Sequence, residues 1–229
     1  MDAPVMVITG ASDGIGAAVA RAAVGDGWRV VLAARRRPLL DALSAELGGA
    51  DVALPVTCDV TEWDQVQGMA DSARGAFGRI DAVLANAGFG AKRGLLAESP
   101  EFWREMVLTN VYGAAITLRA VVPDLIASRG HALLMGSISG RQVGTGSLYS
   151  STKWAVTAMA EAARKDLLGT GVRVTLIAPG VVDTAFYDDP PGGDPLTADD
   201  VARTVMFAVS QPPHVSINEV FMRPTEQDF

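Results

Sequence analysis

Short runs of apolar, often β-branched residues alternate along this chain with longer stretches in which apolar residues recur every three or four positions. The short runs are typical of strands, and the longer stretches are typical of amphipathic helices. The predicted strands are residues 5–9, 29–34, 52–57, 80–85, 131–137, 172–178 and 217–222. The predicted helices are residues 15–25, 38–47, 62–77, 101–128, 149–168 and 198–210.

Three of the predicted helices carry start signals. Ser99 followed by Pro100 predicts an N-cap with proline at the first helical position. Thr61 and Thr197 are each followed three residues later by an aspartate, which predicts two capping boxes with Asp in place of Glu.

Strands that alternate with helices of this length predict βαβ units and therefore a parallel sheet. The apolar strand Val5-Met6-Val7-Ile8 fits burial on both faces of such a sheet. The one segment dense in Pro and Gly, residues 188–195, is too short to link two domains. We therefore predict an α/β fold: a single doubly wound Rossmann domain over residues 1–229, with a seven-stranded parallel sheet and helices on both faces. Ligands of such folds bind beyond the carboxyl ends of the strands.

A glycine-rich loop, Thr9-Gly10-Ala11-Ser12-Asp13-Gly14-Ile15-Gly16, joins the first predicted strand to the first helix. Gly10 would allow the tight turn, Gly14 the close approach of a pyrophosphate, and Gly16 close packing of helix on strand. The helix N-terminus that follows is suited to bind an anion. A mere tight turn is the alternative, but the strand–turn–helix context favours dinucleotide binding. The predicted contacts in this loop are Gly10, Ser12, Asp13, Gly14, Ile15 and Gly16.

The end of the second predicted strand bears on the choice of dinucleotide. NAD sites usually place an acid there for the ribose 2′-hydroxyl, whereas this chain has Ala34 followed by Arg35 and Arg36. A guanidinium suits a 2′-phosphate because it binds phosphate as a two-pronged fork. We therefore predict NADP (NADPH) as cofactor, with Arg35 as its main determinant. The alternative is that these arginines are only solvated, and Asp13 would repel a 2′-phosphate that lay close to it.

Tyr149 and Lys153 lie four residues apart at the start of a predicted helix, and therefore on one face of it. Reduction of a carbonyl needs a proton donor, and the pKa of a free tyrosine, about 10, is too high for proton exchange at neutral pH. One cation about 4 Å away, at an effective dielectric constant of about 20, supplies about 4 kcal/mol toward the phenolate. The spacing therefore indicates an acid/base tyrosine assisted by a lysine.

With the glycine loop and this Tyr–Lys pair, three further motifs appear in order: Asn86-Ala87-Gly88, Gly136-Ser137-Ile138-Ser139-Gly140, and Pro179-Gly180-Val181-Val182-Asp183-Thr184. In order and spacing, the chain resembles the short-chain dehydrogenase/reductase family from end to end. The resemblance implies Tyr149 as acid/base, Ser137 as the residue that holds the substrate oxygen, and Lys153 as a ligand of the nicotinamide ribose that lowers the Tyr pKa. Asn110 resembles the residue that anchors a water leading from Lys153 to a proton relay. Ser137 or Ser139 could instead be ordinary strand-end residues, but in the family's pattern the first serine is catalytic.

The same resemblance implies further cofactor contacts. Asp59 and Val60 would contact the adenine, and Val182 and Thr184 the carboxamide. The implied contacts outside the glycine loop and the arginines are Asp59, Val60, Asn86, Ala87, Gly88, Tyr149, Lys153, Pro179, Gly180, Val182 and Thr184. Family members assemble as tetramers or dimers through two long helices, here residues 101–128 and 149–168, so we expect a homotetramer or homodimer.

The C-terminal segment bears on the substrate. Residues 211–225 resemble the subgroup that oxidises 3-hydroxy acids and serine-like compounds with NADP. This implies a small alcohol or carbonyl substrate, such as a 3-hydroxy acid. The segment 185–196, which corresponds to the family's lid, is short and holds three Asp, which argue against a strongly anionic substrate at that rim. Its Phe186 and Tyr187 could line the pocket or anchor the loop. A general carbonyl reductase or 3-oxoacyl reductase is the alternative enzyme, and a non-catalytic NADPH-binding sensor is the alternative from another class.

Composition narrows the classes of function. A net charge of −7 and the lack of a basic stripe argue against nucleic-acid binding. The single Cys58 excludes a disulfide framework or a cysteine-ligated metal, His131 and His214 lack metal-ligand neighbours, and so we predict no metal. We see no apolar stretch near the roughly 18 residues that span a bilayer. The chain enters an apolar run by Val5, so we expect no signal peptide, no membrane association and a cytoplasmic protein.

Overall fold

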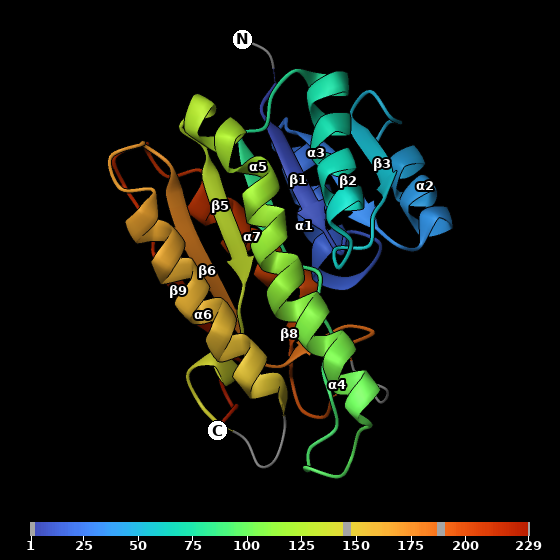
Figure 1. Cartoon of the computed structure of the whole chain (residues 1–229), viewed down its shortest axis with the longest axis vertical. Helices are drawn as coiled ribbons and strands as arrows, with labels where there is room; N and C mark the ends of the chain where they lie inside the picture. The colour runs from blue at the N-terminus through green and yellow to red at the C-terminus, as the bar shows by residue number, and fades with distance from the viewer. Residues whose placement is uncertain (1–2, 144–147, 187–190, 229) are drawn as a thin grey trace.

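The computed structural model describes residues 3–143, 148–186 and 191–228. Seven parallel strands form the main sheet, in the order β3-β2-β1-β4-β5-β6-β9 (Figure 1). Their bounds are β1 (Val5–Thr9), β2 (Arg29–Ala34), β3 (Ala53–Thr57), β4 (Ala82–Ala85), β5 (His131–Met135), β6 (Arg173–Pro179) and β9 (Glu219–Met222). The prediction of a doubly wound α/β sheet is confirmed. The strand order reverses between β1 and β4, and this switch point is where such sheets bind ligands.

Helices cover both faces of this sheet. Helices α1 (Gly14–Gly25), α2 (Arg37–Glu46) and α7 (Ala198–Val209) share one apolar core cluster. Helices α3 (Trp63–Phe77), α5 (Ala114–Ser128) and α6 (Leu148–Asp166) pack in a second cluster on the opposite face, which is the near face in Figure 1. Two-residue strands β7 (Val182–Asp183) and β8 (Leu196–Thr197) add a small parallel sheet beside the main one. The sequence pattern does not predict these strands because two residues have no periodicity.

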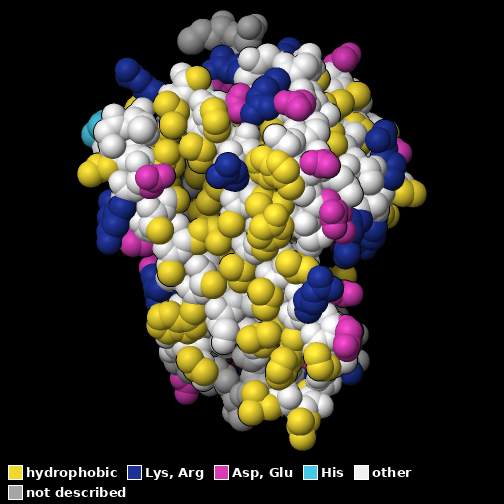
Figure 2. All heavy atoms as spheres, in the orientation of Figure 1, with side chains coloured by type: hydrophobic (Ala, Val, Ile, Leu, Met, Phe, Trp, Pro, Cys, Tyr) yellow, Lys and Arg dark blue, Asp and Glu magenta, His cyan; other side chains and the backbone are white. Residues whose placement is uncertain are grey.

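The predicted helix 101–128 is continuous but not uniform. It comprises α4 (Pro100–Val107), a π-helical segment η1 (Leu108–Gly113), and α5. The segment Pro100–Ser128 is long and apolar enough to cross a membrane by length and composition alone. This corrects the statement from the sequence that no apolar stretch approaches that length. Its apolar character is explained by packing, because Ile116, Val121 and Leu125 lie in the second core cluster. Hydrophobic side chains also gather on the outer surface of the same face (Figure 2).

The helix starts confirm two of the three predicted caps. Ser99 Oγ accepts the Phe102 amide at 3.2 Å, and Thr197 forms a complete capping box with Asp200. The prediction for Thr61 is wrong, because α3 begins one residue later with Glu62 at the N-cap and no side-chain cap. Thr61 instead donates its hydroxyl to Asp59 Oδ1 at 2.8 Å, so its side chain is directed toward the preceding turn.

His131, the first residue of β5, is 1% exposed. Its Nε2 lies 2.7 Å from Thr175 Oγ1 on β6. Because the Thr175 hydroxyl donates to the Ile217 carbonyl, the imidazole must donate from Nε2, and among the described residues Nδ1 has no partner. Burial lowers the pKa of His131 to about 3. This histidine is therefore a neutral core residue.

We expect His131 to make the protein sensitive to acid. Between pH 6.5 and 3 the unfolded chain binds a proton that the folded chain does not, so stability falls as the pH falls through this window. The loss from this group between pH 7 and pH 4.5 is about 2.5 kcal/mol in the free energy of unfolding. Urea denaturation at several pH values measures it. His131→Gln should lose this part of the pH dependence, whereas the exposed His214→Gln should retain it; equal slopes for all three proteins would contradict the prediction.

Candidate active site

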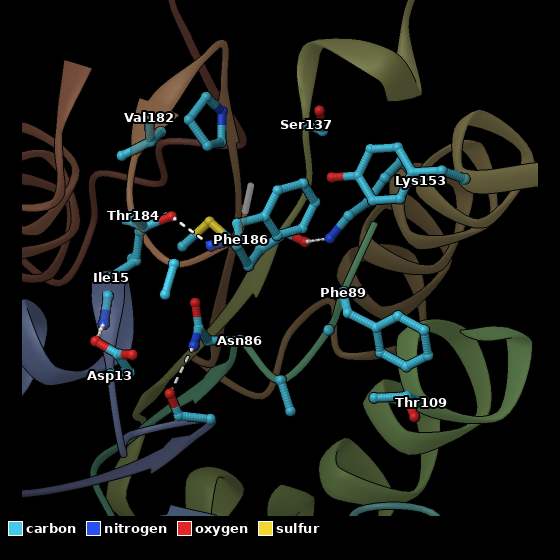
Figure 3. Close-up of a pocket in the computed structure, with 18 of the residues that line it drawn as sticks. Asp13, Ile15, Asn86, Phe89, Thr109, Ser137, Lys153, Val182, Thr184 and Phe186 are labelled. Atoms are coloured by element: carbon cyan, nitrogen blue, oxygen red, sulfur yellow. Dashed lines mark hydrogen bonds between the residues drawn. The ribbon is translucent and has the colours of Figure 1, made fainter. Parts of the chain in front are cut away.

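A cavity of about 590 Å³ opens at the carboxyl ends of the central strands (Figure 3). Nearly all the site residues that the sequence predicts line this cavity. These are Gly10, Ser12, Asp13, Gly14, Ile15, Arg35, Arg36, Asp59, Val60, Asn86, Ala87, Gly88, Ser137, Tyr149, Lys153, Pro179, Gly180, Val182 and Thr184. Two predicted site residues, Gly16 and Asn110, do not line the cavity.

The glycine loop has the backbone that a phosphate site requires. Gly10 and Gly14 adopt φ of +66° and +53°, which side chains disfavour. A Cβ on Gly16 would collide with the carbonyl oxygen of Gly10, so this glycine lets α1 pack directly on the loop. Asp13 caps α1 by accepting the Gly14 amide at 2.7 Å. The loop and the helix N-terminus together fit a dinucleotide pyrophosphate.

The turn after β4 holds this loop in place. Asn86 Nδ2 donates to the Thr9 carbonyl at 3.0 Å, and the hydroxyl of Thr9 accepts the amides of Asn86 and Ala87 at 3.0 and 3.1 Å. A Cβ on Gly10 would lie 2.9 Å from Asn86 Nδ2, so glycine is required for this approach. Asn86 and Ala87 thus support the glycine loop directly through Thr9.

Two arginines lie at the end of the cavity beside β2. Arg36 donates from Nε and Nη2 to Ser12 Oγ at 3.2 and 2.9 Å, and its Nη2 lies 3.6 Å from Asp13 Oδ2. Arg35 also lines the cavity, whereas Arg37 binds Asp41 on its own helix. The Asp13 charge is therefore partly balanced by Arg36. Arg35 is exposed at the cavity wall.

Cys58 lines the same region of the cavity wall. Burial and the neighbouring Asp59 raise the pKa of its thiol to about 11. The thiol therefore stays protonated at neutral pH, as expected of a small buried hydrophobe rather than a reactive cysteine.

Ser137, Tyr149 and Lys153 meet at the other end of the cavity. Ser137 lies two residues beyond the end of β5, and its Oγ accepts the Ser139 amide at 3.1 Å. Tyr149 lies in the first turn of α6, and Lys153 follows one turn later with its Nζ 5.7 Å from the Tyr149 ring centroid. In Figure 3, Ser137 and Lys153 border the same space. This grouping brings a hydroxyl, a phenol and an amine to one place.

Lys153 is buried, and its Nζ donates to the Met135 carbonyl at 2.8 Å. Burial lowers the pKa of Lys153 to about 8, so the amine is mostly a cation at pH 7. A buried cation beside a phenol favours the phenolate. The local chemistry is thus suited to move a proton at neutral pH.

Asn110 lies in η1, behind the cavity wall. Its side chain donates to the Phe89 carbonyl at 2.9 Å, accepts the Phe89 amide at 3.0 Å, and donates to Thr152 Oγ1 at 3.2 Å. It therefore fastens the loop after β4 to α6, next to Lys153. These contacts hold Asn110 behind the cavity wall, and its expected role in anchoring a water near Lys153 stays a prediction.

Sequence reasoning missed several residues that line the cavity: Phe89, Arg93, Thr109, Ile138, Ser139 and Gln227. Ile138 and Ser139 lie within a recognised motif and Phe89 directly follows one, so proximity along the chain could have indicated them. Gln227 lies at the end of the chain, outside any motif. Phe186, for which two roles were open, lines the cavity and packs edge-on against the Tyr149 ring at 5.7 Å. Tyr187 lies outside the described residues. No group of three metal-binding side chains occurs in the described parts of the chain.

Comparison with known proteins agrees with this geometry. The model of the short chain dehydrogenase family matches residues 4–190. Dehydrogenase/reductase SDR family member 11 of Gallus gallus is 35% identical, covering 97% of this chain and 96% of the relative. An alcohol dehydrogenase of the archaeon Thermococcus sibiricus, solved with 5-hydroxy-NADP, has a TM-score of 0.92 at 32% identity over 99% of each chain. A serine dehydrogenase in complex with NADP+ has a TM-score of 0.90 at 30% identity, over 98% of this chain and 96% of its own.

Other solved relatives hold the non-phosphorylated dinucleotides: one from Burkholderia phymatum is in complex with NAD, and a 3-ketoacyl-(acyl-carrier-protein) reductase from Brucella melitensis is in complex with NADH. Fold and relatives therefore agree on a nicotinamide dinucleotide as cofactor, and the glycine loop, the parallel sheet and the end-to-end alignment converge on one assignment. This protein belongs to the short-chain dehydrogenase/reductase family of oxidoreductases.

Proposed function

We propose that this protein is an NADP-dependent oxidoreductase that transfers a hydride between the nicotinamide and a small alcohol or carbonyl substrate. The observation that carries the proposal is the convergence of Ser137, Tyr149 and Lys153 on the cavity that the glycine loop also lines. Because one cavity joins the glycine loop to these three side chains, a dinucleotide held by the loop would reach them.

The proton chemistry follows from the three side chains. A nicotinamide held at this end of the cavity would supply the hydride for the carbonyl carbon. Tyr149 donates its phenol proton to the carbonyl oxygen, and Ser137 donates a hydrogen bond to the same oxygen. The phenolate left on Tyr149 is stabilised by the Lys153 cation, and oxidation of an alcohol runs the same steps in reverse.

The preference for NADP over NAD rests on the arginines beside β2. We expect Arg35→Ala to reduce the NADP preference, as the ratio of kcat/KM values, by about tenfold to a hundredfold, because one charge-assisted hydrogen bond of about 1.5–3 kcal/mol is lost. Arg37→Ala is the matched control, since Arg37 binds Asp41 away from the cavity. Comparable efficiency of the unmodified protein with NAD would contradict the prediction, as would an unchanged preference in Arg35→Ala.

We propose a 3-hydroxy acid as the substrate. The resemblance of residues 211–225 suggests it, and the position of Arg93 in the cavity lining supports it further. Arg93 lines the cavity, is exposed, and has no ion pair within the part of the chain that the structure describes. Its loop adjoins the catalytic end: a Cβ on Gly90 would lie 2.6 Å from the Phe186 ring, which packs on Tyr149. A free guanidinium there suits a substrate carboxylate. Asp194, in the lid segment, does not line the cavity.

We expect Arg93→Gln to raise KM for a 3-hydroxy acid about tenfold, near the lower limit for a charge-assisted hydrogen bond because the site is exposed. KM for the methyl ester of the same acid should change less than about twofold. Lys92→Gln, next in sequence but outside the cavity lining, is the control. An equal loss for acid and ester would show that Arg93 does not bind the carboxylate.

The proposed function is tested by rates of oxidation and reduction against a panel with both NADP and NAD. The panel holds 3-hydroxy acids, serine analogues, simple ketones and 3-oxoacyl thioesters. Turnover of hydroxy acids with NADP supports the proposal. Turnover confined to ketones or thioesters retains the mechanism but replaces the substrate, and no turnover with NADPH still bound favours a sensor.

We also propose a homotetramer or homodimer in the cytoplasm. The support is the outer face of the long helices, where Val107, Tyr112 and Trp154 are 39%, 43% and 43% exposed. Hydrophobic side chains gather on this face (Figure 2), as expected where a second copy packs. Light scattering of the purified protein measures the assembly directly.

A further inference from the structure

The C-terminal tail, residues 223–228, returns from β9 to the wall of the active-site cavity. It turns at Pro224, whose carbonyl accepts the Gln227 amide at 3.1 Å. Gln227 then lines the cavity beside Gly180, Val181 and Val182. The match to the family model covers residues 4–190, so this tail lies beyond it.

A specific hydrogen bond joins the tail to the loop after β6. Gln227 Oε1 accepts the backbone amide of Val181 at 3.0 Å. The other backbone group of Val181, its carbonyl, accepts the Leu196 amide at 3.0 Å. The carbonyl of Val181 is therefore bound to the small sheet, and its amide is bound to the tail. Removing the Gln227 acceptor would leave the Val181 amide without a protein partner, which is costly for a partly buried group.

The tail also explains why residue 180 is a glycine. The φ of Gly180 is not in the left-handed region, so its backbone does not require glycine. A Cβ at this position would collide with Gln227 Oε1 and lie 3.3 Å from Arg223 Cα. Glycine thus leaves the space that the tail fills, and Gly180 and Gln227 form a matched pair.

We propose that Gln227 is a positioning residue. By holding Val181, it fixes the neighbouring Val182 and Thr184 at the nicotinamide end of the site. The inference rests on the proposed function, because it assumes that these residues face a bound nicotinamide. Gln227 acts by holding the loop, not by contact with the reacting atoms. The tail is in this sense a part of the active site.

The test compares two ligands that differ in whether they reach this end of the site. NADPH carries the nicotinamide, whereas 2′,5′-ADP carries only the adenosine end with its 2′-phosphate. Gln227→Leu removes the acceptor oxygen and keeps a branched side chain that is shorter by one atom. We expect it to weaken NADPH binding about tenfold, which corresponds to 1.4 kcal/mol, and to leave 2′,5′-ADP binding within about twofold. Fluorescence titration and calorimetry measure the two Kd values.

Two further variants make the interpretation specific. Gln227→Glu keeps an acceptor oxygen at the same place. This variant should therefore bind NADPH within about threefold of the unmodified protein, unlike Gln227→Leu. Glu226→Gln changes the neighbouring exposed side chain of the same tail and is the control. Gly180→Ala should weaken NADPH binding about as much as Gln227→Leu does. In a protein that already carries Gln227→Ala, adding Gly180→Ala should weaken NADPH binding little further, because the alanine at position 227 leaves space for the new Cβ.

The outcomes separate this inference from the function on which it rests. If the unmodified protein binds neither NADPH nor 2′,5′-ADP, the proposed function fails. If it binds both and Gln227→Leu binds NADPH as tightly as the unmodified protein, the role of Gln227 is refuted. Equal weakening of both ligands would also refute it, since that result indicates a general structural effect of the tail.

Discussion

Tyr149→Phe is expected to lower turnover by about a thousandfold, within the 10²- to 10⁴-fold range of general acid–base catalysis, while NADPH still binds. The substitution removes the phenol oxygen that exchanges a proton with the substrate in the proposed reaction. It leaves the ring, and therefore the edge-on packing against Phe186 at 5.7 Å. Steady-state rates and NADPH titration on the same preparation measure the two effects.

Tyr112→Phe is the matched control for this experiment. Tyr112 is 43% exposed on the long helix and does not line the cavity, so its loss should not change the rate. Turnover retained in Tyr149→Phe would exclude Tyr149 as the acid/base. A biological activity that persists without turnover would favour the alternative of an NADPH-binding sensor.

The parallel sheet was predictable because its strands are buried on both faces. Burial of this kind leaves nearly uninterrupted apolar runs such as Val5–Thr9, and each run is separated from the next by a helix-length amphipathic stretch. The glycine loop was predictable for a related reason, since Gly10 and Gly14 hold backbone angles that few other residues adopt. The division into one domain and the catalytic roles of individual residues stay predictions.

Other features could not be read from local pattern. The π-helical turn at Leu108–Gly113 has the same apolar periodicity as the α-helix around it, so the sequence did not reveal that Asn110 turns toward Phe89. Gln227 is joined to Val181 across 46 positions of sequence by one hydrogen bond, which no motif records. Strand β5 also ends at Met135, two residues before the predicted end, because Ser137 leaves the sheet and caps a short helical turn.

Lys153→Met is expected to lower the rate of alcohol oxidation at pH 7 by about a hundredfold. The Lys153 cation lies 5.7 Å from the centre of the Tyr149 ring, and at an effective dielectric constant of about 20 this separation is worth about 3 kcal/mol toward the phenolate. An energy of that size changes the population of the phenolate about a hundredfold. Methionine keeps an unbranched side chain, shorter by one atom, and carries no charge.

Rates measured across pH distinguish loss of the charge from loss of the fold. Without the cation, the phenolate must form by ordinary titration, so the oxidation rate of Lys153→Met should rise about tenfold per pH unit from pH 7 to pH 9. Lys165→Met, which removes an exposed lysine paired with Glu161, should follow the unmodified protein. An unchanged rate at pH 7, or a low rate that does not rise with pH, would show that Lys153 does not act through its charge.

The same substitution has an opposite effect on stability, because burial lowers the pKa of Lys153 to about 8 from 10.5. Between these values the unfolded chain holds a proton that the folded chain has released, so the lysine's unfavourable contribution to folding is largest below pH 8 and is relieved as the pH rises to 10.5. The stability of Lys153→Met relative to the unmodified protein should therefore decline by about 3 kcal/mol over that window. Urea denaturation at pH 7.5 and pH 10.5 measures the difference. A constant difference would mean that the amine is not buried as a cation. A declining difference together with the lost rate would mean that folding stability is given up to keep a charge beside Tyr149.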